Sequence, residues 1–233
     1  ESVSLPTGAT SMGDYVFYQC AKLKTVTVPA GVTAIGQYVF FGCAALTDIT
    51  LPAGLTAIGD YAFYQCAALP EVKLHEGITT IGISAFSRCD SLETVSIPKS
   101  VTEIGRYAFL RCEKLKEIRV DGNNPNYSSD SAGVLFDKNQ TRLIQAPGAI
   151  SGSYTTPETV NIIGGYAFMY CDGLEKITFT EGLTDIGGNA FTYCTGLTEL
   201  NLKHNAVTDL SYLSTLNNLE TLDVAFNAIS DLR

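Results

Sequence analysis

The chain has 233 residues, of which 45% are hydrophobic and only 17% charged, and its formal net charge is −9. Ample apolar content with little charge excludes a disordered chain. So acidic a chain is not expected to bind nucleic acid or an anionic membrane surface, and no stretch approaches the ~18 consecutive apolar residues of a membrane helix, so we expect no direct membrane insertion.

Both ends of the sequence interrupt a pattern. The stretch "VSLP" at Val3–Pro6 reads as the end of a unit whose beginning is missing, and the closing "ISDLR" stops inside another unit. The opening "ESVSLPTGAT" also lacks the basic start and apolar run of a signal peptide. We therefore expect the sequence to be part of a longer, mature protein.

A repeat of 23 residues organises most of the chain. Successive cysteines lie 23 residues apart except for one gap of 59, so a single insertion of 36 residues interrupts the period. The column of cysteines consists of Cys20, Cys43, Cys66, Cys89, Cys112, Cys171 and Cys194. A phenylalanine precedes each cysteine by three residues. Periods of about 20–50 residues are typical of solenoids, whose stacked units bury one continuous core.

Each repeat unit predicts a strand followed by a turn. Val26 and Val28 are β-branched residues at alternating positions, which favours a short strand. Pro29 ends it because proline has no N–H to donate. In "GDYAFYQC", Ala, Phe and Cys recur at one-turn spacing behind Asp60, a possible cap, which predicts a short helical or 3-10 turn. The predicted fold is a right-handed α/β repeat solenoid, with one short parallel β-strand per coil and the turns on its convex side.

The 36 additional residues, 121–156, form a predicted insert. It begins with turn-forming residues, Asn123, Asn124 and Pro125. The stretches "GVLF" and "TRLIQAP" then flank "DKNQ", which predicts a β-hairpin with a four-residue turn. The insert is either a lid or partner loop, or a loop packed on the flank of the solenoid. The second interpretation is favoured because solenoid insertions are commonly loops on one face.

From Leu197 the period changes to 22 residues. The segments "LTELNLKHNAV" and "LETLDVAFNAI" share the pattern Leu-x-x-Leu-x-Leu/Val-x-x-Asn-x-Val/Ile, with Asn205 and Asn227 in equivalent places. The amides of these asparagines are expected to satisfy backbone groups of the adjacent loop.

The repeats resemble a known family. The motif Ile-Gly-x-Tyr-Ala-Phe-x-x-Cys-x-x-Leu-x-x-Val-x-Ile-Pro resembles the BspA-like leucine-rich repeat surface proteins, and the 22-residue units are similar to internalin-type repeats. The resemblance implies a curved leucine-rich repeat solenoid on a secreted or cell-surface bacterial protein. The expected organisation is a single solenoid over residues 1–233, with BspA-like repeats at 1–120 and 157–196, the insert at 121–156 and truncated ordinary leucine-rich repeats at 197–233.

The sequence predicts no catalytic, cofactor or metal site. The two histidines, His75 and His204, lie outside the cysteine column, so no base partners a nucleophile there. One cysteine per coil does not bring four zinc ligands together. Equivalent side chains of stacked coils also point in parallel, which is poor geometry for disulfides. We therefore expect buried, reduced cysteines and no enzyme activity.

Two surfaces are candidates for binding a partner. On the convex side, a ladder of tyrosines either stacks to seal the flank, which is favoured, or forms an apolar partner strip. The ladder consists of Tyr15, Tyr38, Tyr61, Tyr107 and Tyr166. On the concave side, side chains between the core positions of each strand point outwards. These predicted partner-binding residues are Asp48, Thr50, Glu71, Lys73, Thr94, Ser96, Glu117, Arg119, Lys176 and Thr178.

The concave side predicts a protein partner. It is polar and lacks aromatic anchors, so affinity per module is expected to be modest and useful binding to come from avidity. Lys73 and Arg119 are expected to make the strongest contacts with an acidic partner. We interpret the chain as a non-catalytic, extracellular or cell-surface interaction module, adhering to an extracellular, host or matrix protein. The alternative is a structural spacer that presents other domains of a longer surface protein.

Overall fold

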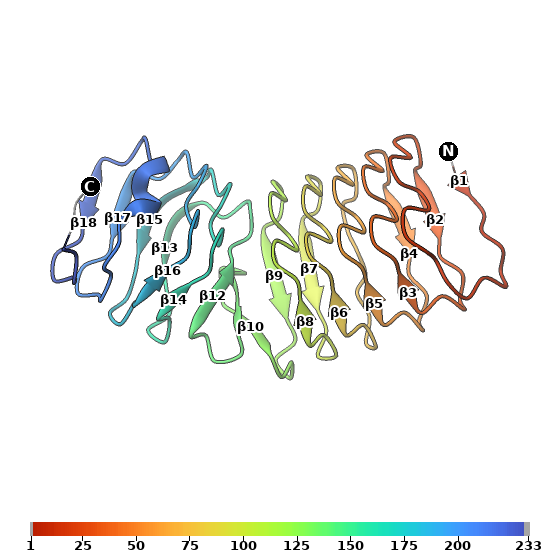
Figure 1. Ribbon diagram of the computed structural model, residues 1–233, viewed down its shortest axis with the longest axis horizontal. Coiled ribbons are helices and arrows are strands. Elements are labelled where there is room, and N and C mark those ends of the chain that lie inside the picture. Colours follow the sequence, from red (N-terminus) through yellow and green to blue (C-terminus); the bar gives the residue numbers. More distant parts are fainter. Residues whose placement is uncertain (1, 231–233) are drawn as a thin grey trace. The chain divides into compact units, whose positions relative to one another are not determined.

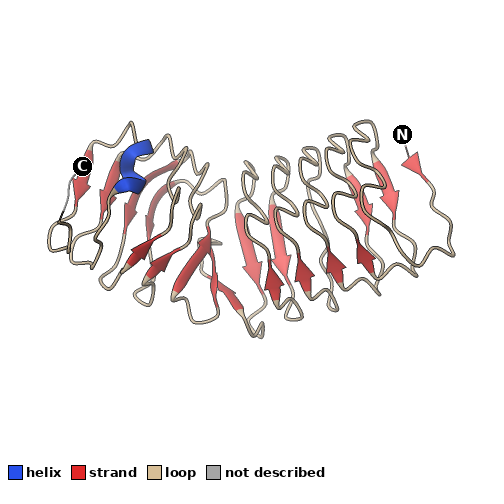
Figure 2. Ribbon diagram, in the orientation of Figure 1, coloured by secondary structure: helices blue, strands red, loops and turns tan. Residues whose placement is uncertain are grey.

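The computed structural model describes residues 2–230 and contains stacked coils with short parallel strands. The coils form two compact units, residues 1–126 and 127–233, which we call unit 1 and unit 2. Figures 1 and 2 show the strands of successive coils lying side by side within each unit. Among the described residues the one helix is the 3-10 helix η1, Ser211–Thr215. The predicted repeat solenoid is therefore confirmed.

Unit 1 has two rows of strands. The first row consists of β1 (Ser2–Val3), β2 (Thr25–Thr27), β4 (Asp48–Thr50), β7 (Thr94–Ile97) and β9 (Glu117–Val120), with an isolated parallel bridge from Glu71 to Thr94. The second row consists of β3 (Ala34–Ile35), β5 (Ala57–Ile58), β6 (Thr80–Ile81) and β8 (Glu103–Ile104). Partners lie 23 residues apart, as the period requires. The second row adds to the single strand per coil that the sequence predicts.

Unit 2 also contains two sheets, and one of them includes antiparallel strand pairs. Its first sheet consists of β10 (Tyr127–Ser129), β11 (Leu135–Asp137), β12 (Arg142–Gln145), β14 (Ile162–Ile163) and β16 (Asp185–Ile186). The pairs β10–β11 and β11–β12 are antiparallel, and the rest of that sheet is parallel. Its second sheet is wholly parallel and consists of β13 (Gly152–Thr155), β15 (Leu174–Thr178), β17 (Glu199–Asn201) and β18 (Thr221–Asp223).

The core of each unit is built from columns of equivalent residues. The phenylalanine column is the largest: Phe40 and Phe63 are fully buried, and their ring centroids lie 5.1 Å apart with nearly parallel planes. In unit 2 the rings of Phe168 and Phe191 stack at 5.7 Å. Offset stacking adds to the free energy gained by burying these rings. Each coil is thus held by its two neighbours rather than by contacts of its own.

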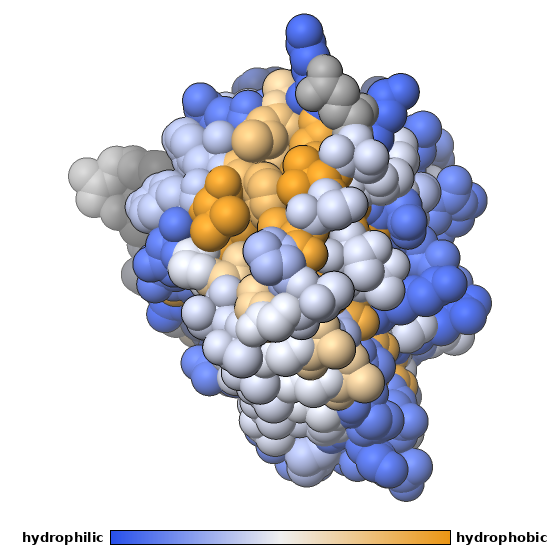
Figure 3. All heavy atoms as spheres, turned by 90° about the vertical axis from the view of Figure 1, so that its right-hand side faces the viewer, coloured by the Kyte–Doolittle hydropathy of each residue, from blue (hydrophilic) through white to orange (hydrophobic). Residues whose placement is uncertain are grey.

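Apolar side chains also reach the surface at one end of unit 1. Figure 3 shows hydrophobic residues gathered on the face seen from the right-hand side of Figure 1. Exposed large hydrophobic residues in the first coils are Val3, Tyr15, Val16 and Tyr18. All four lie at the β1 end of unit 1.

The segment between the two strand rows is made of tight turns. The N–H of Tyr18 donates to the carbonyl of Tyr15 at 3.1 Å, an i→i−3 bond. The N–H of Phe17 instead donates to the carbonyl of Val39 in the next coil, at 2.9 Å. N–H groups therefore bond alternately within the coil and across to its neighbour, so buried backbone donors are satisfied without an α-helix.

Two residues in each of these segments adopt positive φ. In the third coil they are Tyr61, at 55°, and Gln65, at 61°. A left-handed conformation costs a non-glycine residue about 1–2 kcal/mol. The backbone hydrogen bonds between coils hold these residues at positive φ, and their free energy offsets that cost. One coil uses glycine instead, because Gly42 occupies the position of Gln65 with φ of 70°.

The glycine column reflects how closely coils approach. A Cβ added to Gly59 would lie 2.7 Å from the carbonyl carbon of Gly36 in the preceding coil, closer than real Cβ contacts. Only glycine permits this approach, which is why the column after the isoleucine is invariant among the repeats.

Residues 121–156 belong to the core of unit 2 and the end of unit 1. The strands β11 and β12 form an antiparallel hairpin, and Val134, Phe136 and Leu143 are fully buried. The strand β12 pairs in parallel with β14, and β13 pairs in parallel with β15. This part of the chain therefore provides a coil of its own. The interpretation of the insert as a loop on the flank is wrong, and so is that of a lid.

Buried asparagines hold the backbone where the repeat changes. The amide Nδ2 of Asn205 donates to the carbonyl of Leu202 at 3.0 Å, and its Oδ1 accepts from the N–H of Leu183 at 2.7 Å. This confirms the role predicted for Asn205. Asn124, which the sequence indicates only as a turn former, does the same in unit 1, donating to the carbonyls of Pro98 and Val101.

A pair of Gln→Gly substitutions tests the left-handed turn positions. Gln65→Gly should raise the free energy of unfolding by about 1 kcal/mol, because glycine adopts positive φ without a Cβ penalty. The matched control is Gln37→Gly, at an exposed position without positive φ, which should lower it by about 0.5–1 kcal/mol. Urea unfolding followed by circular dichroism measures both. Equal effects of the two changes would contradict the role of backbone strain.

A second substitution tests whether the insert is core. Phe136→Ala should cost about 3–5 kcal/mol of stability because it removes a fully buried ring. The control Asn139→Ala, at an exposed turn position of the hairpin, should change stability by less than about 0.5 kcal/mol. Urea titration of both variants gives the comparison. Equal urea midpoints for the two variants would show that Phe136 is not part of the core and that the insert packs on the flank of the solenoid.

Candidate functional site: the outer strand face

The candidate site is the solvent-facing side of the first strand row, which we call the outer strand face. In unit 1 it consists of Thr25, Thr27, Asp48, Thr50, Glu71, Lys73, Thr94, Ser96, Glu117 and Arg119. The central residue of each strand points inwards, as Val26 and Val95 do, so its neighbours point to solvent. The sequence-predicted residues of unit 1 therefore lie on one face.

Strand register arranges these side chains in two columns. Asp48 lies opposite Thr25, and Thr94 lies opposite Glu117. In the second column, Ser96 lies opposite Arg119. Parallel strands repeat at about 4.8 Å, so the face offers polar groups at a regular spacing. Such a surface can meet an extended partner at many points.

Charges on the outer strand face pair with one another. The guanidinium of Arg119 binds the carboxylate of Glu117 on the same strand, with N–O distances of 2.7 and 2.5 Å. Beside it, Lys116 and Glu93 form a second ion pair at 2.8 Å. The hydrogen bond and charge of Lys116 hold the pKa of Glu93 below its usual value. Exposed ion pairs like these contribute little to stability. They do neutralise charged side chains that could otherwise form ion pairs with a partner.

Lys73 differs from Arg119 in this respect. Its side chain is exposed, and it makes no ion pair with any residue between 2 and 230. The sequence predicts Lys73 and Arg119 as equivalent contacts for an acidic partner. The structure favours Lys73, because Arg119 is already neutralised by Glu117.

Two of the predicted site residues lie in unit 2. Lys176 and Thr178 are on β15, where Thr178 lies opposite Asn201 of β17. The ammonium of Lys176 binds the carboxylate of its register partner Glu199 at 2.7 Å. The solvent-facing side of β15 in unit 2 is thus also polar, and its lysine is already paired.

The tyrosine ladder is stacked in unit 1. The ring centroids of Tyr15 and Tyr38 lie 4.9 Å apart, and those of Tyr38 and Tyr61 lie 4.8 Å apart. The planes in both pairs differ by no more than 5°. The stacking interpretation is therefore confirmed for these three residues. Their faces cover one another, so that edges and hydroxyls meet the solvent.

A second aromatic ladder runs beside the first. Tyr18 stacks on Phe41 at 5.0 Å, and Phe41 stacks on Tyr64 at 4.8 Å. The guanidinium carbon of Arg88 then lies 5.8 Å from the ring centroid of Tyr64, a cation–π contact. The two ladders are most open at their first members, since Tyr15 is 54% exposed. Their signal in the sequence is an aromatic residue in the same column of three successive units.

The cysteines are hydrogen-bond donors in the core. The Sγ of Cys66 donates to the carbonyl of Phe40 in the preceding coil at 3.2 Å, and other members of the column repeat this contact. All seven are free thiols, as expected. Six are buried, but the expectation fails for Cys20, which is exposed. Burial raises the pKa of the Cys43 thiol to about 12.

Residues 2–230 contain no group of three or more His, Cys, Asp and Glu side chains arranged to hold a metal ion. The same residues include no helix with the length and hydropathy needed to cross a bilayer.

Comparison with known proteins places the repeats in a family. The profile described as BspA type Leucine rich repeat region matches residues 1–130 and 151–230, with six copies. The chain belongs to this family. No curated protein sequence matches it. This makes it a BspA-type leucine-rich repeat protein. The similarity of residues 197–233 to internalin-type repeats stays a prediction.

Solved structures share the fold of this BspA-type chain. A leucine-rich repeat protein from Eubacterium ventriosum is 24% identical, with a TM-score of 0.75, and the match covers 100% of this chain and 78% of that one. A leucine rich cell surface protein from Faecalibacterium prausnitzii is 24% identical, with a TM-score of 0.70 and coverage of 99% and 83%. The pneumococcal vaccine antigen PcpA is 26% identical, with a TM-score of 0.62 and coverage of 93% and 49%.

Thiol chemistry checks the cysteine column of this BspA-type protein. In the native state a thiol reagent should modify Cys20 alone, and all seven cysteines should react after denaturation. Intact mass after labelling counts the modified thiols, and Cys20→Ser should abolish native labelling. Native modification of two or more thiols would contradict the burial of the column.

The same thiols should make the protein sensitive to alkali. The pKa of a buried thiol such as Cys112 is raised from its ordinary value of 9.0 to about 12. Its folded pKa exceeds the unfolded one, so its contribution to stability is complete below pH 9 and is lost as the pH rises towards 12. Urea unfolding midpoints should therefore fall progressively over this range. A constant midpoint would contradict the prediction.

Proposed function

We propose that this chain is a non-catalytic interaction module of an extracellular or cell-surface protein, which adheres to a host or matrix protein through its outer strand face. The observation that carries the proposal is the two-column array in unit 1. It offers hydroxyl and charged side chains at strand spacing over β2, β4, β7 and β9. A broad array of this kind suits an extended or large partner, since small ligands use concave, mostly apolar pockets.

The family supports the surface location. One of the similar structures is described as a cell surface protein and another as a vaccine antigen. Both names fit a protein that meets molecules outside the cell. The leucine-rich repeat fold is also typical of protein recognition, and the outer strand face contains no histidine to partner a nucleophile. These points together favour binding over catalysis.

The charge pattern predicts a weak interaction for one module. On the face in unit 1, Arg119 and Glu117 pair with each other, and in unit 2 Lys176 pairs with Glu199. Aromatic anchors are absent from the residues that form the face. Hot spots of tight interfaces are typically Trp, Tyr and Arg. Adhesion would then depend on many coils and many copies acting together. The same pattern is what a structural spacer would show, and that is the alternative.

Charge reversal at Lys73 tests the proposal. Binding of the chain to a panel of purified extracellular-matrix proteins is measured by surface plasmon resonance. Lys73→Glu should weaken binding about tenfold, because it replaces the one unpaired cation of the unit 1 face with an anion. Arg119→Gln should have a smaller effect, since Glu117 already neutralises that guanidinium.

Lys99→Glu serves as the matched control. This lysine is exposed but lies beyond the end of β7, outside the outer strand face, so its reversal should leave binding unchanged. Equal losses in the Lys73 and Lys99 variants would indicate only a net-charge effect. Unchanged affinity in the Lys73, Arg119 and Lys99 variants would show that the partner does not bind the outer strand face. The absence of binding to any matrix protein up to millimolar concentrations would favour the spacer.

A further inference from the structure

Tyrosines of neighbouring coils lie face to face in both units. In unit 1, Tyr38 stacks between Tyr15 and Tyr61, with its ring centroid 4.9 Å from the first and 4.8 Å from the second. In unit 2, Tyr170 stacks on Tyr193 at 4.7 Å. The planes of these pairs differ by 4°, 5° and 13°. The members of each pair are 23 residues apart, so each pair joins two successive coils.

The stacked rings remain partly open to solvent. Tyr15 is 54% exposed and Tyr193 is 53% exposed, whereas Tyr38 and Tyr61 are partly buried. Burial, and then electrostatic interaction with Tyr61 and Tyr15, raise the pKa of Tyr38 above its ordinary value of 10.0. The phenol is therefore protonated at neutral pH, and its oxidation must release a proton. The solvent at the exposed edge of the ladder receives it.

Two phenols in this arrangement are suited to oxidative coupling. Loss of one electron and one proton turns a tyrosine into a phenoxyl radical, whose unpaired electron is shared by the oxygen and the ring carbons ortho and para to it. In dityrosine a bond joins the ortho carbons of two rings. Because Tyr38 and Tyr61 are parallel and occupy equivalent positions, their corresponding carbons lie about as far apart as their centroids, 4.8 Å. Rotation of the two side chains at the solvent edge is then enough to close the distance.

We propose that these stacked tyrosines are a site of oxidative cross-linking, where a haem peroxidase with hydrogen peroxide joins neighbouring coils through dityrosine. Each tyrosine of a pair gives up one electron and one proton. The two radicals form a carbon–carbon bond between ortho positions. The hydrogen on each bonded carbon then leaves as a proton, and each oxygen takes one up, which restores two phenols. The two electrons and two protons released reduce one hydrogen peroxide to two waters.

The backbone holds the reacting rings in place. The N–H of Tyr15 donates to the carbonyl of Gln37, and the N–H of Tyr38 donates to that of Asp60, both at 3.0 Å. Each tyrosine is thus bonded to the residue that precedes the next tyrosine of the ladder. Groups held side by side react faster than the same groups on separate molecules. The cross-link is therefore expected within one chain, and it is independent of the outer strand face and its protein partner.

The second aromatic ladder lacks such a pair. Its members Tyr18 and Tyr64 both stack on Phe41, at 5.0 and 4.8 Å. Phenylalanine has no hydroxyl and forms no phenoxyl radical, so coupling between neighbouring coils is blocked there. The first ladder is interrupted after Tyr61, because Ser84 stands in the equivalent position of the next coil.

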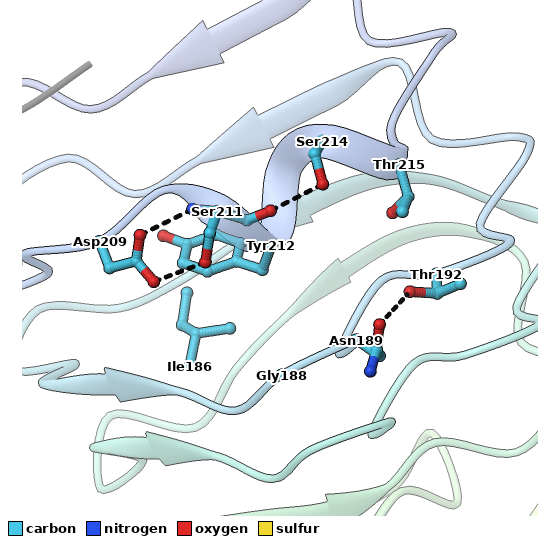
Figure 4. A pocket seen from close by; sticks show the side chains of 9 residues that line it. All are labelled: Ile186, Gly188, Asn189, Thr192, Asp209, Ser211, Tyr212, Ser214 and Thr215. Atoms are coloured by element: carbon cyan, nitrogen blue, oxygen red, sulfur yellow. Dashed lines mark hydrogen bonds between the residues drawn. The ribbon is translucent and has the colours of Figure 1, made fainter. Parts of the chain in front are cut away.

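Tyr212 has a different environment. Figure 4 shows it on η1, among the residues that line a small cavity, and none of the others is a tyrosine. Its side chain is only 7% exposed, and its ring packs against Phe191 with centroids 5.9 Å apart. Tyr212 is therefore expected to stay unmodified.

Mass spectrometry after peroxidase treatment tests the proposal. The exposed thiol of Cys20 is first blocked with iodoacetamide, so that it does not reduce the radicals. The full chain, at low micromolar concentration, is then treated with a haem peroxidase and hydrogen peroxide. The monomer should lose the mass of two hydrogen atoms for each cross-link and gain dityrosine fluorescence. Digestion should yield linked peptides from at least one of the stacked tyrosine pairs.

Two outcomes of this experiment would overturn the proposal. One is the absence of linked peptides from all of the pairs Tyr15 with Tyr38, Tyr38 with Tyr61, and Tyr170 with Tyr193. The other is dityrosine that joins only separate chains, since stacking within the chain would then not direct the reaction.

Two variants that each change one hydroxyl give opposite expectations. Tyr38→Phe keeps the stacked ring, and because Tyr38 couples to only one neighbour at a time, the yield of dityrosine within the chain should fall by half. Phe41→Tyr should raise that yield, with new links from position 41 to Tyr18 or Tyr64. The control Tyr212→Phe should leave the yield unchanged. An unchanged yield in both the Tyr38 and the Phe41 variants, with circular dichroism showing that they are folded, would overturn the proposal.

Discussion

Backbone hydrogen bonding between coils in a fixed register of 23 residues underlies the rest of this structure. In the turns, the N–H of Phe17 donates to Val39, and 23 residues later Phe40 donates to Ala62. The strands repeat the same offset. Because the register is constant, residues of one type align into columns, and the members of a column share the same contacts from coil to coil, apart from exposed first members such as Cys20. The phenylalanines fill the core, the glycines allow close approach, and the aromatic ladders cover the turns.

The columns explain why much of the fold was predictable from the sequence. A period read from Cys20 to Cys112 gives the number of residues per coil, and strand alternation around Val26 gives the outward positions. The second strand row was missed because a two-residue strand has no periodicity to detect. Residues 121–156 were misread because Phe136 and Tyr154 are buried by a coil that lacks the repeat motif. Without the motif, nothing in the sequence marks those residues as core.

The functional surfaces were predictable only in part, for a different reason. Which residues face outwards follows from alternation, but which charges are engaged does not. The bond between Arg119 and Glu117 depends on rotamers on one strand, and it changes Arg119 from a free cation to an internally neutral group. The packing of Tyr212 against Phe191 depends on a 3-10 helix of five residues, Ser211–Thr215. Neither contact corresponds to a repeating pattern in the sequence, so neither could be predicted from it.

The stacking of coils also has a mechanical meaning. A coil of 23 residues adds only about 4.8 Å to the length of a stack, which is the spacing of adjacent strands. Once pulled free of its neighbours, the same segment extends to about 76–83 Å, at ~3.3–3.6 Å per residue. Each coil is held chiefly by the next one, so tension at an end peels coils in sequence rather than breaking the whole unit at once. A chain of this kind that links two surfaces would lengthen stepwise under load and dissipate work at each step, while its remaining coils stay folded.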